Sequence, residues 1–200
     1  MADHLEIEQK YEAGADFALP SLAGLPGVAQ VTEPEVYLLD ATYYDTDDLA
    51  LLGAKVTLRR RTGGPDEGWH LKLPVSADSR RELQEPLGST EVPPRLAARV
   101  EEVTAGRPLH PAASLQTERT VRRLVSTAGV VLAEIADDRV TAQRLGPAQG
   151  EPLIWREVEV EAGEAAGDMT DLMIAVGQRL RTAGAEPSRS ASKVGRVLNS

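Results

Sequence analysis

The chain has 200 residues, which is enough to bury a sizeable core, and we expect one domain over residues 1–200. It carries 22 Lys and Arg against 31 Asp and Glu, and the formal net charge of −9 argues against a nucleic acid or an anionic membrane as a partner. The absence of Cys excludes disulfides, thiolate metal sites and a cysteine nucleophile, and the lack of an apolar signal segment or transmembrane run leads us to expect a cytoplasmic protein.

Eight segments alternate apolar and polar residues with the two-residue period of a β-strand. Turn signals rich in Gly and Pro separate several of them, among them Gly63-Gly64-Pro65 and Ala128-Gly129. In chain order, the predicted strands cover residues 5–12, 35–45, 54–63, 68–75, 80–87, 114–126, 130–145 and 152–162.

Fewer helices are expected, and they do not alternate with the strands. The helix nearest the N-terminus is interrupted by Pro20, and the next begins at Pro94, where a proline suits the first helical turn. The predicted helices cover residues 16–25, 94–104, 168–183 and 190–198. Eight strands without a strand–helix–strand alternation predict an α+β fold that consists mostly of antiparallel β-structure.

The first predicted strand carries charge along one face, because Glu6, Glu8, Lys10 and Glu12 recur at two-residue spacing. Taken alone, such a row indicates a solvated outer face. The last predicted strand repeats the pattern, with an acidic row on one side and valines on the other. Its acidic row consists of Glu157, Glu159 and Glu161.

Other predicted strands carry basic or mixed rows. Carboxylates two residues apart on one strand face lie about 7 Å apart and repel one another unless cations intervene. Since some strands offer mainly acid and others mainly base, we expect the rows to face one another across the lumen of a closed sheet. The further rows are Arg59 with Arg61, His70 with Lys72, Arg80 with Glu82, Arg119, and Glu134 with Asp138.

The chemistry of these rows suggests a class of ligand. Clustered Glu and Asp without Cys suit a hard divalent cation such as Mg²⁺ or Mn²⁺. Arg binds phosphate oxygens as a two-pronged fork, and Lys binds them as a point charge. Together they predict a metal–polyphosphate site with a small-molecule triphosphate or polyphosphate as partner. No GxxxxGK[ST], GxSxG or HExxH motif offers another site.

The ordered set of charged residues resembles the CYTH superfamily, also called triphosphate tunnel metalloenzymes, and in particular bacterial inorganic triphosphatases. Glu6-Ile7-Glu8-Gln9-Lys10 matches the ExExK signature, and Leu58-Arg59-Arg60-Arg61 is similar to the family's L-R-x-R strand. The resemblance extends over about residues 5–196. Further matches, in family order, are Tyr43-Tyr44-Asp45-Thr46, Lys72, Arg80 with Glu82, Arg119, Asp138, Glu157 with Glu159, and Ser192-Lys193.

This resemblance implies an eight-stranded, closed antiparallel β tunnel with a few flanking helices that binds a triphosphate together with Mg²⁺ or Mn²⁺. It implies catalytic positions at Glu8, Glu159 and Lys10, with one of the two carboxylates orienting the attacking water. The implied metal ligands are Glu6, Glu8, Glu157 and Glu159, helped by Glu82 or Asp138. The implied phosphate-binding residues are Lys10, Arg59, Arg61, Lys72, Arg80, Arg119 and Lys193.

The expected function is metal-dependent hydrolysis of a triphosphate, with inorganic tripolyphosphate giving pyrophosphate and phosphate. A class IV adenylate cyclase and a thiamine triphosphatase are alternatives within the same family. Family members often stand beside a helical CHAD domain, and within such a longer protein a non-catalytic polyphosphate-binding module is a further alternative. A plain β-domain with a charged exterior is the remaining one. We expect a monomer or homodimer.

Several nearby residues have more than one interpretation. Thr117 stands where many relatives carry a second basic residue, which weakens the expected phosphate binding on that wall. His70 shares a strand face with Lys72 and is expected either to contact substrate or to be a buried structural residue. Asp45 and Thr46 are expected to cap a turn rather than to act in chemistry.

Overall fold

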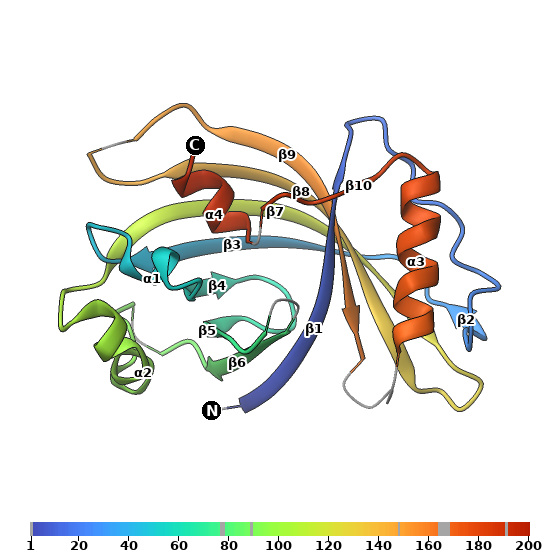
Figure 1. Ribbon diagram of the computed structural model, residues 1–200, viewed down its shortest axis with the longest axis horizontal. Helices are drawn as coiled ribbons and strands as arrows, with labels where there is room; N and C mark the ends of the chain where they lie inside the picture. Colours follow the sequence, from blue (N-terminus) through green and yellow to red (C-terminus); the bar gives the residue numbers. More distant parts are fainter. Residues whose placement is uncertain (1, 77–78, 89, 148, 164–168, 191) are drawn as a thin grey trace.

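The computed structural model describes residues 2–76, 79–88, 90–147, 149–163, 169–190 and 192–200, with the backbone alone for residues 2–6. Eight main strands form the body of the molecule (Figure 1). They are β1 (Ala2–Ala13), β3 (Glu35–Asp45), β4 (Thr57–Thr62), β5 (Gly68–Pro74), β6 (Ser79–Glu85), β7 (His110–Val125), β8 (Val131–Arg144) and β9 (Leu153–Ala162). The shorter elements are β2 (Gln30–Val31), β10 (Glu186–Pro187), α1 (Ala50–Gly53), α2 (Pro94–Thr104), α3 (Thr170–Thr182) and α4 (Lys193–Leu198).

Strand β1 closes the sheet into a barrel, because its two halves pair with the two ends of the sheet. Ala2–Ile7 pairs with β6, and Glu8–Ala13 pairs with β9. Between them the order is β6-β5-β4-β3-β7-β8-β9, and every pairing is antiparallel. Figure 1 shows β1 running across the barrel between these neighbours. The predicted eight-stranded closed antiparallel barrel is therefore confirmed.

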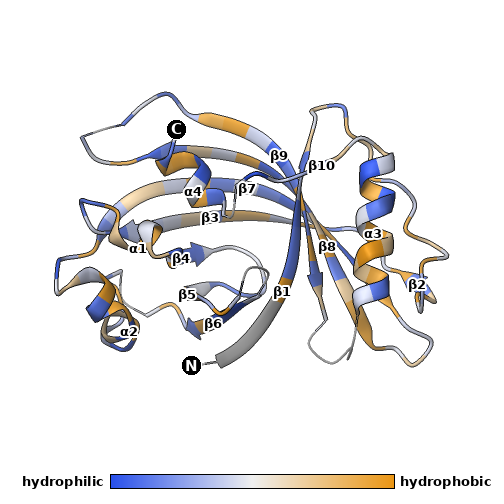
Figure 2. Cartoon of the chain, viewed as in Figure 1, coloured by the Kyte–Doolittle hydropathy of each residue, from blue (hydrophilic) through white to orange (hydrophobic). Residues whose placement is uncertain are grey.

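Two apolar clusters hold the barrel from outside. Helix α3 buries Val176 and Leu180 against the outward face of β9 at Val158, and α2 buries Leu96 in a cluster with Trp69. Each such side chain contributes roughly 1.5–3 kcal/mol when it is removed from water. Figure 2 shows apolar and polar residues alternating along α3, as in an amphipathic helix. Because the outward faces supply these two clusters, much of the inward surface is left for polar groups.

Helix α4 fills one end of the barrel from inside. Its Val197 packs in a cluster with Tyr43 and Trp155. Trp155 shares the strand face of Glu157, so this apolar layer lies directly beside the charged part of the lumen. The side chain of Ser192 accepts a hydrogen bond of 3.0 Å from the backbone N–H of Gly195 and caps the helix. Helix α4 thereby starts at the lumen.

One predicted helix is wrong. Residues 16–25 are mostly irregular, with turns at residues 16 and 23–24, although Leu22 and Leu25 are buried against the α3 cluster. Pro20 removes a backbone N–H, and Gly24 adopts a left-handed conformation with φ 71°, so the segment cannot wind into regular helix.

The remaining predicted elements occur with shifted ends. The helix over 94–104 matches α2, and α4 begins three residues later than expected. The residues just before α3, 164–168, lie outside the described part of the chain. Periodicity missed α1, β2 and β10, which are too short to show a pattern. Among the described residues, no helix is both long and apolar enough to cross a membrane.

Candidate functional site

The inward faces of the barrel strands line a cavity of about 340 Å³. This volume falls in the range of small-molecule binding sites. Carboxylates reach it from β1, β6, β8 and β9, whereas cations come from β1, β4–β7 and α4. The sequence-predicted residues that line it are Glu8, Lys10, Arg59, Arg61, Lys72, Arg80, Glu82, Arg119, Glu159 and Lys193.

Strand register arranges the charges of β7, β8, β9 and β1 in rows across the barrel wall. One row runs through residues 119, 138, 157 and 12, and the next row includes Glu159 opposite Lys10. A third row runs through residues 123, 134, 161 and 8. Residues opposite one another on adjacent strands lie within side-chain contact, so acids and bases from distant parts of the chain become neighbours.

Three acidic side chains converge beside the cavity. Asp138, Glu157 and Glu159 each offer a carboxylate oxygen, and these oxygens lie within 4.8 Å of one another. Asp138 is fully buried, and Glu157 is 3% exposed. Oxygen ligands at this spacing suit a hard divalent cation, whose charge would offset the mutual repulsion of the carboxylates. Such a site fits Mg²⁺ or Mn²⁺.

One carboxylate oxygen of Glu157 accepts a hydrogen bond, and the other forms an ion pair. Its Oε2 accepts a hydrogen bond of 2.6 Å from Nε1 of Trp155. Its buried Oε1 makes no aligned hydrogen bond among the described residues, although Nζ of Lys193 lies 2.7 Å away. The ammonium group of Lys193 thus balances the charge of this buried oxygen, as a bound cation would. Sequence reasoning missed Trp155, although its two-residue spacing from Glu157 placed it on the same strand face.

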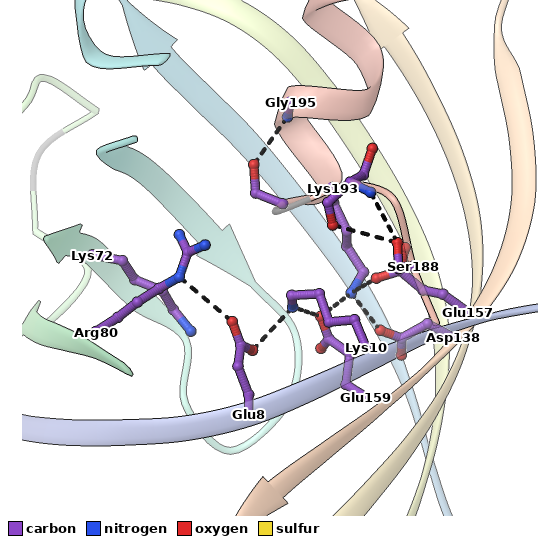
Figure 3. Close-up of polar contacts among 12 residues, drawn as sticks. Glu8, Lys10, Lys72, Arg80, Asp138, Glu157, Glu159, Ser188, Lys193 and Gly195 are labelled. Atoms are coloured by element: carbon purple, nitrogen blue, oxygen red, sulfur yellow. Dashed lines mark hydrogen bonds and ion pairs between the residues drawn. The ribbon is translucent and has the colours of Figure 1, made fainter. Parts of the chain in front are cut away.

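Two lysines neutralise the acidic cluster in this structure (Figure 3). Nζ of Lys193 lies 2.9 Å from Oδ2 of Asp138 and 2.7 Å from Oε1 of Glu159. Nζ of Lys10 lies 2.9 Å from Oε2 of Glu8 and also contacts Glu159. Burial alone would lower the pKa of Lys10, but Glu159 and Glu8 raise it above its ordinary value. Both ammonium groups therefore stay charged inside the lumen.

Arg119 joins the same cluster from β7. Its Nε and Nη2 donate to the two oxygens of Asp138 at 2.8 and 2.7 Å, and Nη2 also donates to Glu159 at 2.6 Å. Burial alone would raise the pKa of Glu159, but Lys10, Lys193 and Arg119 lower it well below its ordinary value. The Glu159 carboxylate is thus ionised inside the lumen.

The opposite wall carries a basic pair, Arg59 and Arg61, on β4. Nη1 of Arg59 donates to the hydroxyl of Tyr43 over 3.2 Å. The Nε atoms of Arg59 and Arg61 are buried and have no hydrogen-bond partner among the described residues. Burial, with repulsion from Arg59 and Arg119, lowers the pKa of Arg61 to about 9, so it remains charged near neutral pH. Buried N–H donors without acceptors indicate a site for an anion.

Other predicted ligands lie apart from the converging carboxylates. Glu8 contacts Lys10 and lies 3.6 Å from Nε of Arg80. Glu82 is buried, 2.5 Å from Nδ1 of His70 and 3.7 Å from Nζ of Lys72. The backbone of residue 6 pairs with β6, but its side chain lies outside the described part of the structure, so Glu6 stays a predicted ligand.

Two predicted turn residues organise the start of α1. Oδ1 of Asp45 accepts hydrogen bonds from the N–H groups of Thr46 and Leu51, both at 2.8 Å, and Oδ2 accepts one of 2.9 Å from Leu52. The hydroxyl of Thr46 accepts a hydrogen bond of 3.0 Å from the N–H of Ala50. The prediction that this pair caps a turn is confirmed.

His70 is almost completely buried, with 1% of its surface exposed. Its Nδ1 faces Glu82, and its Nε2 lies 2.8 Å from the carbonyl oxygen of Asp66. Burial lowers the pKa of His70 to about 4, with Arg59 and Arg61 acting in the same direction against the contact with Glu82. Both ring nitrogens thus contact protein groups, which matches the structural interpretation of this residue.

The stability of the metal-free protein is expected to fall as the pH drops from 6.5 towards 4, because of His70. The pKa of His70 is about 4 when folded and 6.5 in its ordinary state, so the unfolded chain binds more protons in this window. This difference corresponds to about 3 kcal/mol of unfolding free energy, present above pH 6.5 and lost towards pH 4. Urea unfolding at several pH values measures it.

The variant His70→Asn is expected to lose that part of the pH dependence. His110 is exposed at the start of β7, so His110→Asn serves as the matched control and is expected to keep the wild-type slope. Equal slopes for wild type and His70→Asn would contradict the prediction.

The fold and the site define a β-tunnel protein, a closed barrel whose interior carries the charged groups. A family model described as the CYTH domain matches residues 4–171 of the chain. The chain belongs to the CYTH family, and the resemblance drawn from its ordered motifs is confirmed.

Two curated proteins from strains of Mycobacterium tuberculosis, uncharacterized proteins MT2285 and Rv2226, are each 37% identical to this chain over 211 residues. Each alignment covers 98% of this chain and 40% of the relative. The chain therefore spans two fifths of the length of these relatives.

Solved structures share the fold at low sequence identity. A proposed adenylate cyclase from Bacillus halodurans has a TM-score of 0.63 and 17% identity, and the match covers 98% of both chains. A proposed adenylyl cyclase from Hippeastrum, described as having a dominant triphosphatase activity, has a TM-score of 0.55 and 17% identity. That match covers 97% of this chain and 95% of the plant protein. At this identity the likeness establishes the architecture.

Proposed function

We propose that this protein hydrolyses a triphosphate in the presence of a divalent metal, with inorganic tripolyphosphate as the substrate. The observation that carries the proposal is the charge separation inside one closed lumen. Three converging carboxylates lie on β8 and β9, and the buried guanidinium groups of Arg59 and Arg61 lie on β4. A linear polyanion with a bound metal matches both walls at once.

The basic residues bind and orient the phosphate chain. Arg59 and Arg61 offer the buried Nε donors, and Arg119 offers a planar fork from the adjoining wall. Lys10 and Lys193 act as compact point charges. Lys72 and Arg80 line the same cavity and are proposed to bind phosphate as well. Such fixed positive groups stabilise the charge of a phosphoryl-transfer transition state and hold the reacting atoms in line.

The proposed metal ligands are Asp138, Glu157 and Glu159, and the sequence motifs add Glu6, Glu8 and Glu82. When bound, Mg²⁺ or Mn²⁺ would act as a Lewis acid on phosphate oxygens and reduce their negative charge. Lys10 and Lys193 already contact Glu159 of this cluster, and their ammonium groups are proposed to bind phosphate oxygens as well.

The attacking water needs an acceptor for its proton. Glu8 and Glu159 are the proposed candidates, since both line the cavity and both contact Lys10. The oxygen of water bonds to the terminal phosphorus while the bond from that phosphorus to the bridging oxygen breaks. The carboxylate takes the proton, and pyrophosphate and phosphate are the products. Lys10 positions the carboxylate and the phosphate.

The plant neighbour described with a dominant triphosphatase activity supports this reading, and the neighbours described as adenylate cyclases favour ATP cyclisation as a second candidate. A thiamine triphosphatase is a further candidate. A non-catalytic polyphosphate-binding module is also a candidate, because the Mycobacterium tuberculosis relatives are longer than this chain.

A phosphate-release assay separates these functions. The protein is incubated with tripolyphosphate, ATP or thiamine triphosphate, each with Mg²⁺, with Mn²⁺ and with chelator, and cyclic AMP is measured in the ATP reactions. We expect metal-dependent release from tripolyphosphate at the highest rate. Cyclic AMP formation would favour the cyclase, and tripolyphosphate binding without turnover would favour the binding module.

A further inference from the structure

The turn between β4 and β5 folds into the cavity. Gly63 and Gly64 have φ values of 77° and 81°. A Cβ atom on Gly63 would lie 2.1 Å from the carbonyl oxygen of Leu38, and one on Gly64 would lie 2.8 Å from the side chain of Leu39. Only glycine allows the turn to lie this close to β3. As a result, the next two residues, Pro65 and Asp66, line the cavity.

The turn presents a carboxylate to the basic wall. Oδ2 of Asp66 contacts Nη2 of Arg61. The two partners differ in exposure, since 4% of the Arg61 side chain and 42% of the Asp66 side chain are accessible. The cation is thus part of the lumen wall, whereas the anion approaches it from the solvent side. Arg61 still has its Nε without a hydrogen-bond partner among the described residues.

The backbone of the turn is held in place at Asp66 itself. Nε2 of His70 donates to the carbonyl oxygen of Asp66 over 2.8 Å. His70 is buried, so this contact fixes the position of the Asp66 main chain. The partly exposed Asp66 side chain can leave Arg61 by rotation, without movement of the turn. The Asp66 main chain is therefore fixed, whereas its carboxylate can be replaced by another anion as the partner of Arg61.

We propose that Asp66 is an internal counter-ion that occupies Arg61 in the empty tunnel and that an incoming phosphate group must displace. The proposal rests on the proposed function. Displacement costs every anion that reaches Arg61 the same free energy. An anion with few other contacts, such as orthophosphate, does not recover that cost. A tripolyphosphate carries several charges and contacts several cations at once, and these contacts offset the cost of displacing Asp66. Asp66 sets the threshold of charge that an anion needs to enter.

Isothermal titration calorimetry in chelator-containing buffer tests the proposal, with tripolyphosphate and orthophosphate as ligands and no turnover. We expect Asp66→Asn to bind tripolyphosphate about fivefold more tightly than wild type, the ratio expected when a partly exposed ion pair no longer competes. Orthophosphate binding is expected to tighten as well. The matched control is Glu67→Gln, which removes the same charge from an exposed residue of the same turn and is expected to change affinity less than about twofold.

A double-mutant cycle links the effect to Arg61. In an Arg61→Gln background, Asp66→Asn is expected to leave tripolyphosphate affinity unchanged, because no partner remains to be released. Weaker or unchanged binding by Asp66→Asn, in a protein whose thermal unfolding matches wild type, would overturn the counter-ion role and leave the proposed function standing. No binding by wild type or Asp66→Asn in chelator would overturn the counter-ion role, whereas the metal-dependent function would still be decided by the phosphate-release assay. Binding by Asp66→Asn alone would support the counter-ion role strongly.

Discussion

Glu157→Gln is expected to lower metal-dependent phosphate release from tripolyphosphate by roughly 10²–10³-fold, the loss typical when one group that stabilises transition-state charge is removed. Glu157 is one of three converging carboxylates, and its Oε1 pairs with Nζ of Lys193 at 2.7 Å. A neutral amide keeps the hydrogen bond from Trp155 but loses the negative charge that a divalent cation requires. Initial rates at saturating Mg²⁺ or Mn²⁺ measure the effect.

The matched control is Glu118→Gln on the outer face of β7. Glu118 is 48% exposed and pairs with Arg139 at 2.9 Å outside the barrel, so its loss removes equal charge without touching the lumen. We expect wild-type rates from it. Wild-type turnover by Glu157→Gln would place the catalytic metal elsewhere.

Arg119→Gln is expected to reduce the unfolding free energy of the metal-free protein by roughly 3–5 kcal/mol, the range for breaking a buried ion pair from one side. Arg119 donates to both oxygens of Asp138, which is fully buried, and to Glu159. The variant leaves Lys193 and Lys10 to neutralise this cluster. Urea unfolding measures the loss of stability. The KM for tripolyphosphate is expected to rise, because the variant lacks one of the guanidinium groups proposed to bind phosphate.

Arg139→Gln is the control for this variant, since Arg139 lies on the outer face of β8 and is 61% exposed. Its loss is expected to cost less than about 1 kcal/mol. Added Mn²⁺ should stabilise Arg119→Gln more than wild type, because fewer internal cations then balance the carboxylates. Equal unfolding free energies for Arg119→Gln and Arg139→Gln would show that the ion pairs of Arg119 make no net contribution to stability.

The local sequence pattern was sufficient to predict most of the strands of the barrel. The eight strands follow from two-residue alternation, and α2 follows from Pro94 and a helical period. The helix predicted over residues 16–25 does not form, because Pro20 interrupts it and because Leu22 and Leu25 are buried by packing under α3 rather than by a local helix. Hydrophobic spacing reports burial, and burial here depends on an element about 150 residues away.

In the candidate site, too, one part could be predicted from the sequence and another part required the structure. Two-residue spacing placed Glu157 with Glu159 and Arg59 with Arg61, since residues on one strand face stay together in any sheet. The spacing left open whether Asp138 or Glu82 lies beside Glu157 and Glu159. The β8–β9 register sets Asp138 opposite Glu157, whereas Glu82 lies with His70 and Lys72 on the far side of β1.

By itself, the sequence determined that charged residues recur along one face of several strands, and its ordered motifs determined the family. Only the tertiary structure decided that these rows face inward, because that depends on the closure of β1 onto both β6 and β9. It also decided the partners of Arg61, since Asp66 reaches the lumen through the fit of two glycines against β3. Strand faces are set by local chain geometry, but convergence of side chains requires register and closure, which are long-range properties.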